Sequence, residues 1–238
     1  METGLGSLSA ARRSCLMLYS VFMPFSFPAV YPILDSAIIP PANREQFLHR
    51  LGSELAHAGV TLLEYRNKTG SDAELLADAA VLRAAMPSGM VKLIFDDRVD
   101  LVDAVGFDGV HVDAGDATPA AARQALGPAR IVGAYGGTER LLPGILHQPA
   151  DYLSIGPVFP TTTKQTDKAP IGPEGVRRLR GEAGPDAVLV AVGGVTLQTA
   201  PAVLAAGATL IGVAAAIFQT ADPAAEFRRW LAALDARP

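Results

Sequence analysis

From residue 29 onward, short apolar runs rich in β-branched side chains alternate with longer amphipathic segments. The apolar runs are continuous, which is typical of strands that are buried on both faces of a parallel sheet. We predict eight such strands, at residues 29–35, 60–66, 91–95, 109–112, 130–135, 152–156, 187–193 and 209–214.

The segments between these runs carry helix signals. Ser71 begins a capping box, and Thr118 and Asp222 each precede a proline at a first helical position. Gly59 stands where a helix ends and a left-handed residue is favoured. Eight strands that alternate with eight helices predict a (β/α)8 TIM barrel, a single α/β domain over residues 29–238.

An open, doubly wound sheet is the alternative for the same alternation. Such sheets usually have fewer strands and a glycine-rich turn after the first strand. The residues after the first predicted strand read SAIIPPAN and contain no glycine. The barrel is therefore favoured.

Residues 1–28 precede the alternation and include two arginines followed by an apolar stretch. This arrangement faintly resembles a signal peptide, but the stretch is short for a membrane span and is interrupted by Pro24 and Pro28. We expect an N-terminal extension that is either disordered or an artefact of an upstream start codon, with true initiation at Met17 or Met23.

Composition narrows the classes of function. Hydrophobic residues make up 50% of the chain, which excludes a disordered protein. The net charge of −4 offers no basic surface, so we expect neither nucleic acid nor membrane as a partner. The single cysteine, Cys15, excludes an internal disulfide and fits a cytoplasmic protein.

The polar residues at the carboxyl ends of the predicted strands are the candidates for function, because barrel active sites lie there. Arg66, Lys68 and Lys164 are cations suited to phosphate oxygens. Asp97 and Asp116 are hard oxygen donors suited to Mg²⁺. Two interpretations stay open: a Mg²⁺–diphosphate site, or surface ion pairs that contribute little.

Two further stretches fit a phosphate site in the same barrel. GPVFPTTTK, residues 156–164, offers three hydroxyls and an ammonium, although a polar loop explains it too. Gly193, Gly194 and residues 214–216 offer backbone amides without bulky side chains, although a turn and helix packing explain them equally. Barrels often bind phosphate with the loops after strands 7 and 8.

Taken in order, these motifs resemble the thiamine-phosphate synthase family from Tyr31 to Leu234. The family patterns Q-L-R-x-K, N-D-R-x-D-L, G-V-H-L-x-x-x-D and G-P-x-F-x-T-x-T-K appear as EYRNK (64–68), DDRVDL (96–101), GVHVDAGD (109–116) and GPVFPTTTK (156–164). The last match is the most specific.

The resemblance implies a Mg²⁺-dependent transferase acting on phosphorylated small molecules. The enzyme would join 4-amino-2-methyl-5-hydroxymethylpyrimidine diphosphate to 4-methyl-5-(2-hydroxyethyl)thiazole phosphate, or its carboxylated form, and release pyrophosphate. In this family the C–O bond breaks largely before attack, so that catalysis depends on positioning and electrostatics. A homodimer is left open.

The resemblance also implies roles for individual residues. It assigns catalysis to Arg66, Lys68 and Lys164, and the metal to Asp97 and Asp116. It assigns the pyrimidine diphosphate to Glu64, Tyr65, Arg66, Asn67, Lys68, Asp96, Tyr135 and Lys164. It assigns the thiazole phosphate to Thr161, Thr162, Thr163, Gly194, Ala214 and Ala215.

Four positions depart from the residue usual in the family. Glu64 replaces glutamine, Asp96 replaces asparagine, and Tyr135 and Ala215 replace serine. A carboxylate at position 96 should weaken diphosphate binding unless it joins the metal or is protonated. Glu64 loses the donor of an amide, and the larger Tyr135 narrows the pocket.

Three alternatives stay open, and the four departures motivate the sensor among them. One is a thiazole tautomerase-like paralogue, which would need no Mg²⁺–diphosphate site. Another is a non-catalytic barrel that binds thiamine precursors as a sensor. The third is a sugar-phosphate isomerase or epimerase, for which Asp35 and Glu64 are poor candidates as an acid–base pair. Retained Asp97, Asp116 and Lys164 favour the synthase over the tautomerase.

Overall fold

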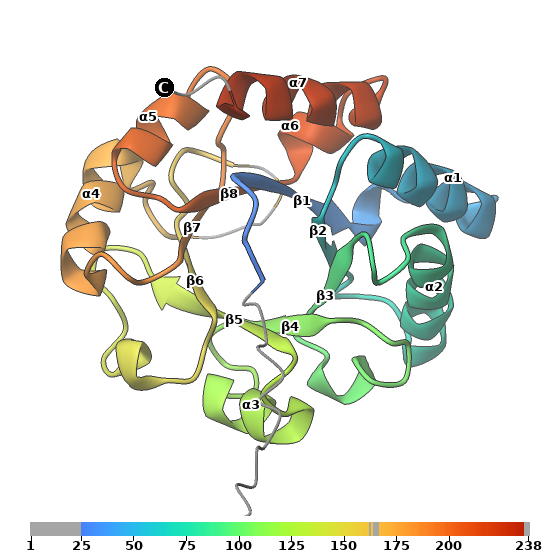
Figure 1. The fold of residues 1–238 in the computed structure, drawn as a ribbon, viewed down its shortest axis with the longest axis horizontal. Coiled ribbons are helices and arrows are strands. Elements are labelled where there is room, and N and C mark those ends of the chain that lie inside the picture. Colours follow the sequence, from blue (N-terminus) through green and yellow to red (C-terminus); the bar gives the residue numbers. More distant parts are fainter. Residues whose placement is uncertain (1–24, 162, 164–166, 236–238) are drawn as a thin grey trace, which may run out of the picture.

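A computed structural model describes residues 25–161, 163 and 167–235. Eight parallel strands close into a barrel in chain order, surrounded by helices (Figure 1). The strands are β1 Val30–Asp35, β2 Leu62–Arg66, β3 Lys92–Asp96, β4 Gly109–Val112, β5 Ile131–Gly137, β6 Tyr152–Ile155, β7 Leu189–Val192 and β8 Leu210–Val213. Each begins and ends within two residues of its predicted position, so the predicted barrel is confirmed.

The connections between strands are less regular than predicted. The α-helices are α1 Arg44–His57, α2 Asp72–Ala85, α3 Pro119–Leu126, α4 Gly172–Ala183, α5 Ala200–Ala205, α6 Ala215–Phe218 and α7 Pro223–Asp235. The β3–β4 and β5–β6 connections, both fully described, contain only the 3-10 turns Val99–Leu101 and Ile145–His147. The prediction of a helix after every strand was therefore wrong at these two places.

Backbone chemistry explains the two missing helices. Pro143 and Pro149 interrupt the β5–β6 connection, and proline cannot continue a helix interior. Gly144 between them is in the left-handed region, at φ 72°. In the β3–β4 connection, Asp97 at φ 72° and Gly106 at φ 66° have left-handed backbones, which an α-helix does not accommodate. Only the short segment between these two residues could form helical turns.

The predicted helix signals are confirmed. The side chains of Ser71, Thr118 and Asp222 each accept a hydrogen bond from a backbone N–H three residues on, at 3.3, 3.1 and 2.8 Å. Gly59 follows α1 with φ 96°, as expected for a left-handed residue after a helix. No helix among the described residues is long and apolar enough to cross a lipid bilayer.

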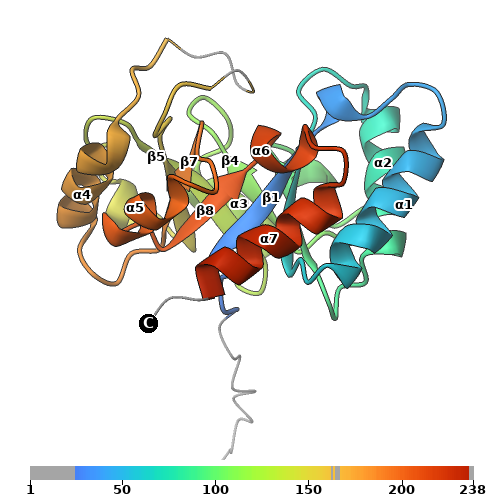
Figure 2. The ribbon, with the colours of Figure 1, turned by 90° about the horizontal axis from the view of Figure 1, so that it is seen from above.

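A layer of apolar and aromatic side chains closes the amino-terminal end of the barrel. This layer consists of Tyr31, Leu62, Ile94, Ile131, Tyr152, Val190 and Leu210. Phe25 and Phe27 pack against it from the segment before β1, and the rings of Phe27 and Tyr152 meet edge-on at 5.7 Å. In Figure 2 this segment leaves on the side opposite to the long connection between β6 and α4. Among the described residues this apolar layer fills the amino-terminal end of the barrel, and the lined cavity lies at the carboxyl ends of the strands.

Candidate active site

A cavity of about 550 Å³ lies at the carboxyl ends of the strands. Its lining includes residues of all eight strands or of the segments that follow them. The predicted site residues that line it are Glu64, Arg66, Asp96, Tyr135, Thr161, Thr163, Gly194, Ala214 and Ala215. This volume is in the usual range for a small-molecule site.

Cations and carboxylates alternate where β2 and β3 end. Arg66 pairs with Asp35, and its Nε lies 3.1 Å from Asp96 Oδ2. Lys68 pairs with Asp97, and its Nζ lies 3.0 Å from Asp96 Oδ1. Asp96 is therefore held between two cations. This local compensation offsets the negative charge that the asparagine-to-aspartate departure introduces.

Three carboxyl groups form an acidic cluster beside these cations. Asp96, Asp97 and Asp113 each offer an oxygen within 4.8 Å of the others. Asp97 Oδ1 is buried and has no hydrogen-bond partner among the described residues. Its backbone adopts φ 72°, a left-handed conformation that aspartate tolerates better than most residues. The cluster offers the hard oxygen donors that a divalent cation takes.

Asp116 lies outside this acidic cluster. Its Oδ2 accepts a hydrogen bond of 2.9 Å from the backbone N–H of Asp113, and its side chain is exposed. Asp116 therefore holds the loop that carries Asp113. Its predicted role as a metal ligand stays a prediction.

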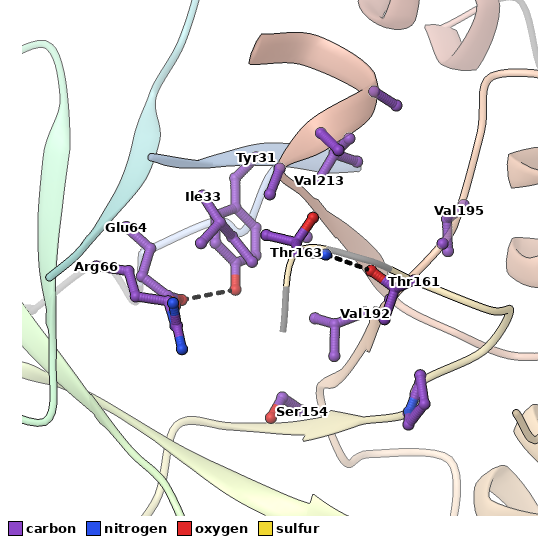
Figure 3. Close-up of a pocket in the computed structure, with 18 of the residues that line it drawn as sticks. Tyr31, Ile33, Glu64, Arg66, Ser154, Thr161, Thr163, Val192, Val195 and Val213 are labelled. Carbon is purple, nitrogen blue, oxygen red and sulfur yellow. Dashed lines mark hydrogen bonds between the residues drawn. The ribbon is translucent and has the colours of Figure 1, made fainter. Parts of the chain in front are cut away.

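Glu64 lies on the cavity floor with only 5% of its surface exposed. The hydroxyl of Tyr31 donates a hydrogen bond of 3.1 Å to Glu64 Oε2 (Figure 3). Burial, and then the negative charge of Asp96, raise the pKa of Glu64 to about 8. Glu64 is therefore largely a neutral carboxylic acid at pH 7. That form has one donor and an acceptor, so it restores the donor that was expected to be lost with glutamine.

Tyr65 and Asn67 lie outside the cavity lining. The Tyr65 ring packs edge-on against Phe95 at 5.7 Å, and its hydroxyl donates to Asp78. Asn67 Nδ2 donates to Tyr65 Oη at 3.1 Å and to Glu74 Oε1 at 2.9 Å. Alternation along β2 explains this, because successive side chains point to opposite faces of a strand. The structure thus does not bring these two residues to the predicted pyrimidine site.

The cavity also contains polar residues that the sequence analysis did not assign. Tyr31, His111, Asp113, Ser154 and Lys168 all line it. His111 Nε2 lies 3.3 Å from Ser154 Oγ. The alternation that places Glu64 and Arg66 on one face also places His111 and Asp113 on one face. The two-residue alternation of side chains along a strand could have identified His111 and Asp113 from the sequence.

The ends of β7 and β8 line the cavity with small residues. Gly193 and Gly194 adopt φ 86° and 66°. A Cβ on Gly194 would collide with the carbonyl oxygen of Pro160, and one on Gly193 would lie 2.7 Å from Pro157 Cβ. Glycine is needed here because the segment after β6 crosses directly over this turn. Both glycines nevertheless also line the cavity.

The described part of the threonine motif faces the same region. Thr161 and Thr163 line the cavity, and the backbone N–H of Thr163 donates to Thr161 Oγ1 at 3.3 Å (Figure 3). Thr162 and Lys164 lie outside the described residues. Their predicted roles stay predictions.

Tyr135, the departure on β5, is held firmly at the rim. Its hydroxyl lies 2.5 Å from Thr138 Oγ1. The ammonium of Lys168 lies 3.7 Å from the centroid of its ring. The ring lines the cavity and holds a cation, and its narrowing of the pocket stays a prediction.

Comparison with known sequences identifies the family of this chain. The family model described as thiamine monophosphate synthase matches residues 30–217, which span all eight strands. The chain belongs to the thiamine monophosphate synthase family. The resemblance expected from the motifs is confirmed, and all the lining residues of the cavity except Gln219 lie within the matched range.

Individual members of the family agree with this match. The thiamine-phosphate synthase of Koribacter versatilis is 38% identical over 188 residues, covering 79% of this chain and 88% of the relative. That of Agrobacterium fabrum is 38% identical over 192 residues, covering 79% and 87%. The solved structure of thiamine phosphate pyrophosphorylase from Pyrococcus furiosus has a TM-score of 0.70 at 26% identity, covering 87% and 95%.

Proposed function

We propose that this chain is a thiamine-phosphate synthase. It transfers the pyrimidinylmethyl group of 4-amino-2-methyl-5-hydroxymethylpyrimidine diphosphate to the ring nitrogen of 4-methyl-5-(2-hydroxyethyl)thiazole phosphate and releases pyrophosphate. The family match over residues 30–217 carries the proposal. The curated relatives of that name, at 38% identity, support it.

The reaction exchanges one bond for another without a proton transfer. The bond between the methylene carbon and the diphosphate oxygen breaks, and its electron pair leaves with the diphosphate. The lone pair of the thiazole nitrogen then forms the new bond to the same carbon. Positioning and charge stabilisation are the main requirements, and a general base is not needed.

The diphosphate belongs at the β2–β4 side of the cavity. Arg66 lines the cavity there and offers a fork of donors for its oxygens. Lys68 lies outside the lining but pairs with Asp96, which belongs to it, and offers a point charge. Asp96, Asp97 and Asp113 would hold Mg²⁺, with Asp116 as the further ligand that the family motif predicts. Bound there, Mg²⁺ supplies positive charge for the departing diphosphate. Lys164 is proposed as an additional diphosphate contact on the family motif alone.

The thiazole phosphate belongs at the β6–β8 side. Gly194, Ala214 and Ala215 expose backbone there, and Thr161 and Thr163 add hydroxyl groups. Small residues allow a phosphate to approach backbone amides closely. Ala215 lacks the hydroxyl of the serine usual in the family, but its backbone amide is unchanged.

The positions and partners of the candidate acid–base residues argue against the isomerase alternative. Glu64 is held by Tyr31, and Asp96 lies between Arg66 and Lys68. Asp35, the other acid–base candidate, pairs with Arg66 and does not line the cavity. An isomerase needs an acid and a base that both face substrate. Asp35 and Glu64 therefore do not form that pair, because only Glu64 lines the cavity.

A turnover and binding experiment separates the proposed synthase from its relatives. The purified chain is incubated with both precursors and Mg²⁺, and the products are resolved by chromatography, with the Agrobacterium fabrum enzyme as the positive control. The proposal predicts thiamine phosphate only when both precursors and Mg²⁺ are present. Binding of the thiazole phosphate without product would support the sensor, and isomerisation of the thiazole phosphate would support the tautomerase-like paralogue.

We also propose that the protein works in the cytoplasm. The single cysteine fits a reducing compartment. The relatives are biosynthetic enzymes by name, which supports the same location.

A further inference from the structure

Lys168 and Tyr135 form a contact at the rim of the cavity. The Lys168 ammonium lies 3.7 Å from the centroid of the Tyr135 ring, over its face. Tyr135 belongs to β5, and Lys168 to the segment between β6 and α4. Both line the cavity. An aromatic face attracts an ammonium, so the ring restricts where this flexible side chain lies.

The ring itself is fixed by its neighbours. The register between β5 and β6 shifts between Tyr135 and Gly137, and such irregularities commonly re-aim a side chain. The Tyr135 hydroxyl lies 2.5 Å from Thr138 Oγ1, and Thr138 Oγ1 donates to the carbonyl oxygen of Gly156 at 3.4 Å. The contact thus ties the end of β5 to the segment after β6.

The contact lies across the cavity from the cations of β2. In a closed barrel numbered in chain order, β6 is opposite β2, and β3 and β4 lie between β2 and β5. Arg66 and Lys168 both line the cavity, and the acidic cluster of Asp96, Asp97 and Asp113 belongs to the ends of β3 and β4, which lie between β2 and β5 in the strand order. A multivalent anion bound over that cluster would meet positive charge on both sides.

A second cation in the lining favours an anionic substrate. Among the described residues, Asp96 and Asp113 line the cavity beside the largely neutral Glu64, and Arg66 and Lys168 are its arginine and lysine side chains. Arg66 already pairs with Asp35 and Asp96. A diphosphate carries more charge than a phosphate, so it depends more strongly on additional cations.

We propose that Lys168 is an anion-binding, specificity-determining residue for the diphosphate-bearing substrate, and that the Tyr135 ring positions it. This inference rests on the proposed function. The family pattern usually has serine where this chain has Tyr135, and serine has no aromatic face to hold an ammonium. Where the family pattern has the small hydroxyl group of serine, this chain has the Tyr135 ring with the Lys168 ammonium over its face.

Five variants test the proposal. Lys168→Met removes the charge at similar length, and Lys168→Arg keeps it. Tyr135→Phe keeps the ring, Tyr135→Leu removes it, and Lys168→Met/Tyr135→Leu combines the losses. Arg177→Met, an exposed cation of α4 outside the cavity lining, is the matched control.

The first measurement is binding of inorganic pyrophosphate with Mg²⁺, which needs no turnover. We expect Lys168→Met to raise its Kd about tenfold, the effect of one charged hydrogen bond. Lys168→Arg and Tyr135→Phe should stay within about threefold of wild type, and Arg177→Met should not change. Tyr135→Leu should weaken binding only while Lys168 is present, so the double variant should match Lys168→Met. An unchanged Kd in Lys168→Met, or additive losses in the double variant, would overturn the proposal.

The second measurement is turnover, which separates the two anionic substrates. Lys168→Met should raise KM for the pyrimidine diphosphate about tenfold and leave KM for the thiazole phosphate within about twofold. A rise confined to the thiazole phosphate overturns the assignment to the diphosphate. If wild type forms no thiamine phosphate while Lys168→Met still weakens pyrophosphate binding, the proposed function fails and the anion-binding role stands. If wild type turns over and Lys168→Met behaves identically, only this inference fails.

Discussion

The hydroxyl of Tyr31 donates a hydrogen bond to Glu64 at 3.1 Å on the floor of the active-site cavity. The bond crosses from β1 to β2 and is buried. It favours the ionised carboxylate, but burial and the charge of Asp96 oppose it and prevail. A position that is usually glutamine in the family is therefore occupied by an acid that is largely protonated at neutral pH.

Glu64 should make the stability of the protein depend on pH. Its pKa is about 8 in the folded chain and near 4.5 when unfolded. A raised pKa contributes stability that is complete below pH 4.5 and is lost as pH rises towards 8. Glu64→Gln should remove this loss, so the stability of the variant relative to wild type should rise by on the order of 3 kcal/mol between pH 5 and pH 8. Urea unfolding at both pH values checks this, and parallel pH profiles for the two proteins would contradict it.

Asp97 should control the metal dependence of activity. Asp97→Asn keeps a residue that tolerates the left-handed backbone but removes the charge from an oxygen donor. We expect the Mg²⁺ concentration for half-maximal activity to rise at least ~10-fold with little change in Tm. Asp100→Asn, an exposed residue paired with Arg98, is the control. Unaltered Mg²⁺ dependence in Asp97→Asn would remove Asp97 from the metal site.

Gly194 should tolerate no side chain. Alanine there would be forced to φ 66° and would collide with the carbonyl oxygen of Pro160. We expect Gly194→Ala to destabilise the protein by roughly 1–3 kcal/mol and to raise KM for the thiazole phosphate. Gly181→Ala, in α4 with open space around the new methyl group, should be neutral or stabilising. Equal stability of the two variants would contradict the packing described for Gly194.

Tyr65 should matter for stability and not for substrate binding. Tyr65→Phe removes the hydroxyl that donates to the buried Asp78 and leaves that carboxylate with Arg44. The expected cost is roughly 1–3 kcal/mol, with both KM values within about twofold of wild type. Thermal unfolding and steady-state kinetics check this. A large rise in KM for the pyrimidine diphosphate would restore the role that the motif predicted for Tyr65.

The sequence predicted the barrel and one face of the site because both follow from strand periodicity. Continuous apolar runs identified all eight strands, and the cation at the end of β2 led to Arg66, which lines the cavity. Motif matching without strand parity also selected Tyr65 and Asn67, whose side chains lie outside the cavity lining. Reading β2 with a period of two would have separated them from Glu64 and Arg66.

Strand periodicity and motifs did not predict contacts between segments that are distant in the sequence. The contact between Lys168 and Tyr135 joins segments 33 positions apart in the sequence and depends on a shift of register in β5. The raised pKa of Glu64 depends on burial and on Asp96 of the next strand. Both are tertiary effects, for which no local pattern exists.

The most direct test of the central claim is simultaneous measurement of pyrophosphate and thiamine phosphate during turnover. The claim is that one cavity lets the diphosphate depart and the thiazole nitrogen take its place. We predict equimolar release of the two products, with no pyrophosphate beyond slow hydrolysis when the thiazole phosphate is omitted. Pyrophosphate release that does not respond to the thiazole phosphate, with no thiamine phosphate formed, would contradict the account.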